Sequence, residues 1–260
     1  MSKPGKIRLD KLLAERGLAP SREAAQRLIL AGAVRIANDE RRQTAGLLMA
    51  ADAEVSVIAP ERFVSRGGLK LEAALDFFSL DPAGMICLDV GASTGGFTDC
   101  LLQRGAAKVF AVDVGRGQLA WKFHGDPRVE SHEKVNAREL PAEFAVGVQL
   151  AVMDVSFISI TLILPRLRKL LPEAPVLSLI KPQFEAGRHA VGTGGIVRDP
   201  EVWREVLTRI GANAAGLGYA VAGPCVSPIT GGDGNREFFY LFKPGAPQPP
   251  ASEKIAAVLG

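Results

Sequence analysis

Residues 88–106 read LDVGASTGGFTDCLLQRGA, and this stretch decides the fold. The apolar run that ends at Val90 predicts a buried strand, and the stretch that begins near Gly96 predicts a helix. Glycines between them let the backbone approach a ligand, and the start of the helix offers free N–H groups to an anion. The stretch therefore predicts an α/β unit with a nucleotide-like cofactor at the turn.

The turn itself, GASTGG at residues 91–96, does not select the cofactor. Ser93 stands where the G-x-G-x-x-G pattern of dinucleotide sites has its middle glycine, and the Lys of a Walker A loop is missing. Asp113 follows the next apolar run, 22 residues after Gly91, where an acid can accept hydrogen bonds from a ribose diol. These residues are compatible with NAD, with S-adenosylmethionine, and with glycines that serve only tight packing.

Strand-like and helix-like segments alternate after residue 68. The apolar runs MICLDVG, KVFAVDVG, LAVMDVSF and VLSLIKP are separated by helical stretches. This alternation predicts a Rossmann-like α/β fold, with a mostly parallel sheet covered by helices on both faces. The runs YAVAGPCVSPI and REFFYLFKP predict an antiparallel hairpin at the end of the sheet. We expect this domain at residues 69–245, followed by a loose Pro-rich tail at 246–260 with a short final helix.

The positive charge of the chain is concentrated at one end. Residues 1–62 carry 11 Lys and Arg against 8 Asp and Glu, whereas residues 63–260 carry 20 of each. A local basic excess indicates an anionic partner, and RNA or DNA is favoured over a membrane. Charge alone is equally compatible with a solvated surface.

Cysteine and histidine usage and hydropathy exclude several classes of protein. Cys87, Cys100 and Cys225 lack metal-motif spacing and are odd in number for a disulfide framework, so we expect reduced thiols. The three histidines share no ligand spacing, so we expect no metal. Residues 1–10 lack the apolar core of a signal peptide, and the longest apolar stretch, 150–164, is interrupted by Asp154. We expect a cytoplasmic protein without a membrane partner, with a monomer favoured.

The first segment contains a compact helix pair. The stretch RLDKLLAERGLAPSREAAQRLILAGAVRI resembles the αL-type RNA-binding module found in a ribosomal protein, some tRNA synthetases and many pseudouridine synthases. The module usually has Asn-Gly after its first strand, where this chain has IANDERR. The resemblance implies a small α+β RNA-binding domain at residues 1–60 and a linker at 61–68. The cations expected to contact RNA are Arg8, Lys11, Arg22, Arg27 and Arg35. The alternative is a helical mini-domain that binds nothing.

Four charged residues occupy special places in the α/β segment. Asp154 and Lys181 each follow a buried run, Glu237 begins the last strand, and Lys70 lies in the helix after the linker. Strand ends on the ligand side of such a sheet converge, and buried charges need partners or a function. These two lysines and two acids therefore form either one functional pocket or a structural cluster of ion pairs.

Seven motifs together extend over almost the entire chain. They are VSRGGLKLEAAL, LDVGASTGGFTD, AVDVGRGQL, VMDVSFIS, IKPQFEAGR, GGIVRDP and GNREFF. In combination they resemble the TlyA family, ribosomal-RNA 2′-O-methyltransferases also labelled hemolysin A, within the FtsJ-like group. The resemblance implies S-adenosylmethionine as cofactor, ribosomal RNA or ribosomal subunits as partner, and a cytidine ribose as the methylated group. A non-catalytic ribosome-assembly factor and a membrane-acting hemolysin are the alternatives.

The resemblance also assigns site residues. A catalytic Lys-Asp-Lys-Glu tetrad falls on Lys70, Asp154, Lys181 and Glu237. The cofactor residues fall on Gly91, Ala92, Ser93, Thr94, Gly95, Gly96, Phe97, Asp113, Val114 and Asn136. A lysine can act on a ribose 2′-hydroxyl as a neutral base or as a cation that stabilises developing alkoxide. We expect Lys181 in this role, oriented by Asp154, with like-charge influence from Lys70. Glu237 would hold Lys70 or the ribose.

Two further features stay open at the level of sequence. The Gly-rich, basic stretch at residues 184–200 is interpreted as a lid over cofactor and RNA, with a mobile connection as the alternative. Phe97 and Phe157 are candidates for stacking on a base, and a packing role is equally compatible with each.

Overall fold

The chain folds into two compact units, Met1–Arg62 and Phe63–Gly260. The structure, a computed structural model, describes residues 5–30, 32–37, 39, 43–57, 62–232 and 234–259. Most of the IANDERR segment lies outside the described residues. Each unit is described below by itself.

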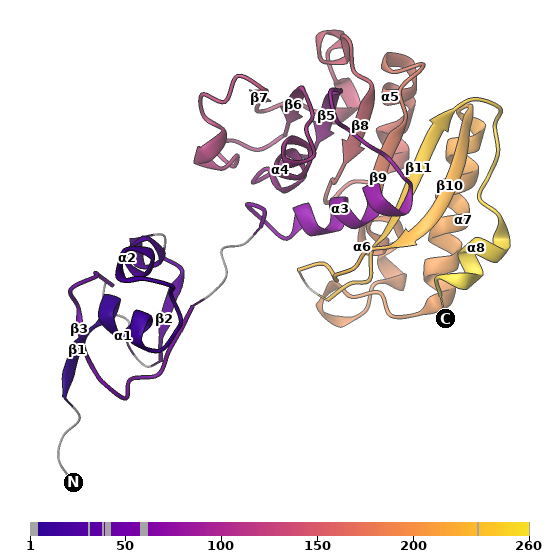
Figure 1. The fold of residues 1–260 in the computed structure, drawn as a ribbon. Coiled ribbons are helices and arrows are strands. Elements are labelled where there is room, and N and C mark those ends of the chain that lie inside the picture. Colours follow the sequence, from indigo (N-terminus) through magenta and orange to yellow (C-terminus); the bar gives the residue numbers. More distant parts are fainter. Residues whose placement is uncertain are drawn as a thin grey trace. The chain divides into compact units, whose positions relative to one another are not determined.

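The first unit is a helix pair flanked by two short antiparallel sheets (Figure 1). Its elements are β1 (Lys6–Arg8), α1 (Leu9–Glu15), α2 (Arg22–Leu30), β2 (Val34–Ile36), β3 (Leu48–Ala50) and β4 (Val55–Val57). Strand β1 pairs with β3, and β2 pairs with β4. Ser21 caps α2, because its Oγ accepts a hydrogen bond from Ala24 N at 3.1 Å. Leu9, Leu13 and Ala25 form the small core of this unit.

The second unit is built on one seven-stranded sheet in the order β10-β11-β9-β8-β5-β6-β7. Its strands are β5 (Ile86–Val90), β6 (Lys108–Val112), β7 (Val129–His132), β8 (Leu150–Met153), β9 (Val176–Ile180), β10 (Tyr219–Val226) and β11 (Phe238–Pro244). Its α-helices are α3 (Gly67–Phe77), α4 (Gly96–Gln103), α5 (Leu164–Leu170), α6 (Pro182–Glu185), α7 (Pro200–Gly216) and α8 (Ser252–Ala257). Strands β5 to β9 are parallel to one another, and β11 is antiparallel to both β9 and β10. The predicted fold class, with its closing hairpin, is confirmed.

Two apolar cores lie on opposite faces of this sheet, because successive side chains of a strand alternate between its faces. On β5, Leu88 belongs to the core shared with α5, α7 and α8. Its neighbour Cys87 belongs to the other core, which contains residues of α3 and α4. Helices therefore cover both faces (Figure 1), and the edge that holds the carboxyl ends of the parallel strands stays open for a site.

The linker and the tail are more ordered than the sequence indicates. Phe63 is buried and a Cβ on Gly68 would overlap it, so the chain enters the second unit already packed against α3. In the tail, Gln248 pairs with the edge strand β10, and Ile255 and Leu259 are buried in the core. These apolar side chains are what attaches the Pro-rich segment to the unit.

Candidate active site

The four charged residues singled out in the sequence gather at one edge of the sheet. Asp154 directly follows β8, Lys181 directly follows β9, and Glu237 directly precedes β11. Because β11 runs antiparallel to β9 with Phe238 opposite Ile180, Glu237 and Lys181 leave the sheet side by side. Lys70 comes from the first turn of α3 and is buried.

The four charges form two short ion pairs. Lys181 Nζ lies 2.6 Å from Asp154 Oδ1 and also donates to Ser156 Oγ at 2.9 Å. Lys70 Nζ donates to Glu237 Oε2 at 2.5 Å, with side chains only 9% and 2% exposed. Glu237 thus holds Lys70. The negative charge of Glu237 also compensates the positive charge of Lys70, which weakens the electrostatic repulsion between Lys70 and Lys181.

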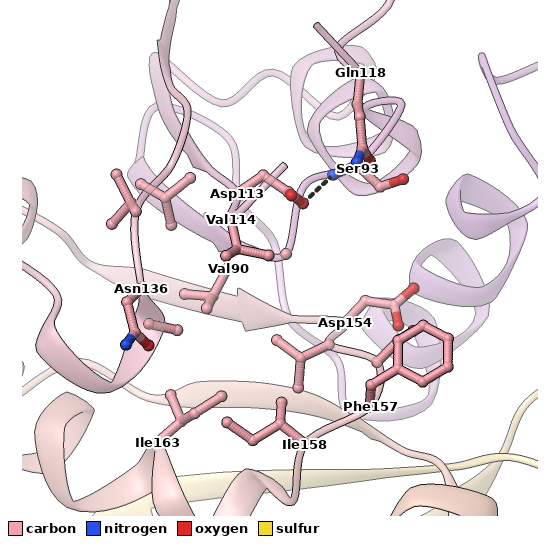
Figure 2. Close-up of a pocket in the computed structure, with 16 residues that line it drawn as sticks. Val90, Ser93, Asp113, Val114, Gln118, Asn136, Asp154, Phe157, Ile158 and Ile163 are labelled. Atoms are coloured by element: carbon pink, nitrogen blue, oxygen red, sulfur yellow. Dashed lines mark hydrogen bonds between the residues drawn. The ribbon is translucent and has the colours of Figure 1, made fainter. Parts of the chain in front are cut away.

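A cavity of about 440 Å³ opens beside the first ion pair (Figure 2). Asp154 and Phe157 lie together on one side of it, and Asn136 lies on the other (Figure 2). The volume is within the range of about 300–1,000 Å³ typical of small-molecule sites. Apolar side chains such as Val114 and Ile163 form much of the lining, so the cavity suits a ligand with a flat apolar part and a few polar groups.

Gly91 brings the end of β5 against the end of β8. Its φ is +84°, and a Cβ there would overlap the carbonyl oxygen of Asp154 and approach its carbonyl carbon at 3.0 Å. Only glycine fits a left-handed position with backbone this close. Gly91 therefore fixes where Asp154, and through it Lys181, lies at the cavity wall.

Asp113 organises the glycine turn. Its Oδ2 accepts a hydrogen bond from Ser93 N at 2.8 Å (Figure 2), and its Oδ1 accepts one from Gly115 N at 2.6 Å. A carboxylate offers about four lone-pair sites, so Asp113 retains capacity for the hydroxyls of a ribose. Across the cavity, Asn136 Oδ1 accepts from Arg138 N at 3.1 Å, which directs this amide at the rim.

The structure brings five of the ten expected cofactor residues to the cavity. Of the other five, Ala92, Thr94, Gly95 and Gly96 belong to the turn and Phe97 lies on α4. Those at the cavity are Gly91, Ser93, Asp113, Val114 and Asn136. Thr94 is exposed and Ala92 is buried behind the turn. Gly95 and Gly96 allow close packing, since a Cβ on Gly95 would lie 2.5 Å from Phe123 and one on Gly96 would overlap Ser65.

The two aromatic candidates have opposite environments. Phe97 is buried and stacks on Phe239 with centroids 6.2 Å apart, so the packing interpretation applies to it. Phe157 is 90% exposed at the cavity rim, with an unusual φ of +65° and Phe184 at 4.9 Å. A strained, exposed aromatic residue at a cavity is typical of a ligand contact.

One polar residue of the site, Ser156, and one buried acid beside it, Asp89, were missed in the sequence. Ser156 was overlooked although it lies in the motif that carries Asp154, two residues further on. Asp89 lies within β5, is fully buried, and accepts a hydrogen bond from Thr98 Oγ1 at 2.7 Å. Burial raises the pKa of Asp89 to about 7. The available signal was an acid inside an otherwise apolar strand.

The Gly-rich stretch at residues 184–200 is anchored at both ends. Glu185 is buried, and its carboxylate accepts hydrogen bonds from Ser159 Oγ at 2.6 Å and Ile160 N at 2.8 Å. Further along, the buried Asn235 accepts from Val197 N and donates to the carbonyl of Gly195, both at 2.9 Å. Any movement of this stretch is therefore confined to the residues between these anchors.

Two of the five expected RNA-contacting cations in the first unit share one buried acid. Asp10 accepts hydrogen bonds from Arg8 at 3.0 and 3.1 Å, Arg22 at 3.2 Å and Gln26 at 2.9 Å. The Arg8 guanidinium holds the pKa of Asp10 well below its usual range. Both arginine side chains remain about half exposed, so Asp10 fixes two guanidinium groups at the surface.

The other three expected cations have separate surroundings. Lys11 Nζ lies 3.4 Å from Glu15 Oε1 on the same helix. Arg35 donates to the carbonyl oxygens of Gly32 and Val34, each at 3.2 Å. Arg27 is exposed on α2.

Comparison with known proteins places this geometry in a family. Residues 63–243 match the FtsJ-like methyltransferase family, and residues 7–45 match the S4 domain. The chain belongs to the FtsJ-like methyltransferase family. We call Phe63–Gly260 the methyltransferase unit and Met1–Arg62 the S4 unit.

Several relatives are similar to this chain over most of their length. The chain is 46% identical over 241 residues to Mycobacterium tuberculosis TlyA, named 16S/23S rRNA (cytidine-2′-O)-methyltransferase, covering 92% of this chain and 90% of that protein. It is 52% identical over 248 residues to YqxC of Bacillus subtilis, covering 94% and 88%. A solved Streptococcus thermophilus structure is similar with a TM-score of 0.74 and 45% identity, covering 99% of this chain and 95% of that chain. The resemblance to the TlyA family is confirmed.

Neither a membrane-spanning helix nor a metal-binding cluster occurs among the residues that the structure describes. None of their helices combines the length and apolar character needed to cross a membrane. Within the same ranges, no group of three or more His, Cys, Asp or Glu side chains could hold a metal ion.

Proposed function

We propose that this protein uses S-adenosylmethionine to methylate the 2′-hydroxyl of a cytidine in ribosomal RNA. The observation that carries the proposal is the Lys181–Asp154 ion pair, in which Asp154 lines the cavity and its Oδ1 lies 2.6 Å from the Lys181 amine. The name of the TlyA relative supports the ribosomal-RNA cytidine as target. The S4 unit supports RNA as the partner.

The residues of the cavity fit S-adenosylmethionine. Asp113 can accept hydrogen bonds from the ribose diol, and Asn136 can contact the adenine edge while Val114 and Ile163 pack on its faces. The absence of a Cβ at Gly91 lets the backbone of Asp154 lie against the end of β5, and Asp154 itself lines the cavity where the reacting end would lie. When bound, the cofactor supplies an electrophilic methyl group on a sulfonium, whose sulfur keeps the electron pair of the broken bond.

The chain's own residues then act on the target ribose. A ribose 2′-hydroxyl must lose its proton as its oxygen forms the new bond to carbon. We assign the uptake of that proton to Lys181 Nζ in its neutral form, after the ammonium of the ion pair has released a proton to solvent. Asp154 and Ser156 hold this amine from two directions. Lys70 and Glu237 form a buried, charge-balanced pair, and Glu237 leaves the sheet beside Lys181. Positioning of the hydroxyl supplies the rest of the rate enhancement.

The exposed ring of Phe157 fits the base of the same nucleotide. A base must leave its stack before its ribose can enter a cavity of this kind. An aromatic ring at the rim, 90% exposed, offers the unstacked base a new surface. Arg8 and Arg22 in the S4 unit are the cations proposed to contact phosphates, together with Lys11, Arg27 and Arg35.

The test is methyl transfer to ribosomal subunits isolated from cells that lack the gene, with the modified riboses mapped. We expect one or more new 2′-O-methylcytidines with the wild-type protein. Lys181→Ala should lower the rate by roughly 10²- to 10⁴-fold, whereas Lys243→Ala, an exposed lysine at the far end of β11, should not change it. Lys181→Arg keeps the charge but cannot accept a proton, so substantial activity in that variant would refute Lys181 as proton acceptor. RNA binding without any methyl transfer by the wild type would favour a ribosome-assembly factor.

A further inference from the structure

The loop between β6 and β7 presents an aromatic pair at the surface. Trp121 is 81% exposed, and its ring stacks on that of His124 with centroids 4.5 Å apart and planes 22° apart. A single exposed apolar residue requires no explanation. Two planar rings stacked in parallel at the surface are different, because they already have the geometry of a stacking surface for a further flat ring.

This pair is held in place by its neighbours. Phe123, which lies between Trp121 and His124 in the sequence, is buried and packs against Gly95 of the glycine turn. Lys122 Nζ lies 2.7 Å from the buried carboxylate of Asp99 on α4. Ala120 N donates to the carbonyl of Thr94 at 3.1 Å. The 3₁₀ turn at Trp121–Phe123 is thus attached to the glycine turn and to helix α4 that follows it, and Trp121 is exposed beside these anchors.

The loop carries cations beside the pair, of which Lys122 and Arg128 are each paired with an acid. Arg116 and Lys122 are exposed on the same loop, and the side chain of Lys122 stays 49% exposed despite its pairing with Asp99. Arg128 at the end of the loop is paired with Asp126. Stacking rings beside cations are the chemistry by which single-stranded RNA is bound.

The loop also lies where a bound RNA would pass. Val114 and Gln118, from the first half of the loop, line the cavity. Trp121 follows Gln118 by three residues, or at most about 11 Å of chain. RNA whose ribose enters the cavity would therefore have neighbouring nucleotides within reach of Trp121.

We propose that Trp121 and His124 form a stacking platform for an RNA base next to the target nucleotide, with Arg116 contacting the adjacent phosphate. The platform is separate from Phe157, which lies on the Asp154 side of the cavity. This inference rests on the proposed RNA substrate, and it adds a second recognition surface that belongs to the methyltransferase unit.

The chain offers a direct probe because it has only two tryptophans, Trp121 and Trp203. In a Trp203→Phe variant all tryptophan emission comes from Trp121, and titration with a single-stranded oligocytidylate RNA should quench it as the base stacks. In the reciprocal Trp121→Phe variant, emission from Trp203 should stay unchanged. Fluorescence anisotropy of a labelled copy of the RNA shows when binding is saturated. Unchanged Trp121 emission at saturation would overturn the proposal.

A second measurement does not depend on the single-tryptophan variant. With ribosomal subunits as substrate, Trp121→Ala should raise KM by roughly 5- to 100-fold, the range for loss of one stacked base, and leave kcat within about twofold. Phe77→Ala, an exposed aromatic residue on α3, is the matched control and should change neither. An unchanged KM in Trp121→Ala would also overturn the proposal. If neither the wild type nor any variant transfers methyl groups but RNA still quenches the emission of Trp121, the proposed function fails and the platform stands.

Discussion

Replacement of Gly91 by alanine tests how the fold positions the catalytic pair. The substitution has two separable costs. A non-glycine residue in the left-handed region costs about 1–2 kcal/mol. Overlap of the new Cβ with the backbone of Asp154 adds about 1–3 kcal/mol, because neither strand end can move without disturbing the sheet. We expect Gly91→Ala to lower the free energy of unfolding by about 2–5 kcal/mol.

Gly125 is the matched control. Its φ of +85° is almost identical to that of Gly91, but nothing lies within 4 Å of a Cβ built there. Gly125→Ala should therefore cost only the first, conformational part, about 1–2 kcal/mol. Effects of the added methyl group on the unfolded chain are shared by the two variants and cancel in the comparison.

The assay is urea unfolding followed by tryptophan emission. Both tryptophans lie in the methyltransferase unit, so the signal reports the unfolding of this unit. The two variants should differ by about 1–3 kcal/mol, and only Gly91→Ala should also lose methyl transfer, because displacement of a positioning group by about 1 Å can cost 10²-fold in rate. Equal destabilisation of the two variants would refute the steric argument.

Three further predictions concern other buried polar groups. Asp89→Asn should remove one contribution to the pH dependence of the free energy of unfolding. The folded pKa of about 7 lies above the unfolded value, so the stabilisation present at low pH is lost as the pH rises toward 7. The wild type should lose about 2 kcal/mol relative to the variant between pH 5.5 and 7.5, and parallel urea stability curves would contradict this. Asp10→Asn should weaken RNA binding by about tenfold although it removes a negative charge, because the guanidinium groups of Arg8 and Arg22 lose the carboxylate that holds them. Tighter RNA binding by this variant in a filter assay would argue against a positioning role for Asp10. Asn235→Ala should cost about 2–4 kcal/mol and raise amide hydrogen exchange at Val197, whereas unchanged exchange there would show that this hydrogen bond does not hold the segment.

Much of the fold could be predicted because its signals are local. The strand, turn and helix around Gly91 follow from periodicity and glycine chemistry within a few residues. The alternation of strand-like and helix-like segments predicted the parallel sheet. The two apolar runs near the end of the chain predicted the hairpin between β10 and β11. The order of the Pro-rich tail was not predictable in this way, because it depends on where Ile255 and Leu259 meet the core.

The candidate site was less accessible to sequence reasoning. Phe97 and Phe157 carry the same side chain beside similar motifs, yet one is buried against Phe239 and the other is 90% exposed. Exposure is a property of the packed structure, so no local pattern separates the two. The carboxylate of Asp89 was overlooked for the same reason, since its raised pKa comes from burial on both faces of the sheet.

By itself, the amino-acid sequence determined the two-unit organisation, the α/β class and the residue types available for methyl-transfer chemistry. Local hydrogen bonding and hydrophobic periodicity act over a few residues, and both are readable from the chain. Only the tertiary structure decided the pairing, in which Lys70 meets Glu237 across 167 positions and Lys181 meets Asp154. The Lys181–Asp154 contact follows from the neighbouring positions of β9 and β8 in the sheet, and the Lys70–Glu237 contact follows from α3 and β11 sharing one core. Both are properties of the packed structure.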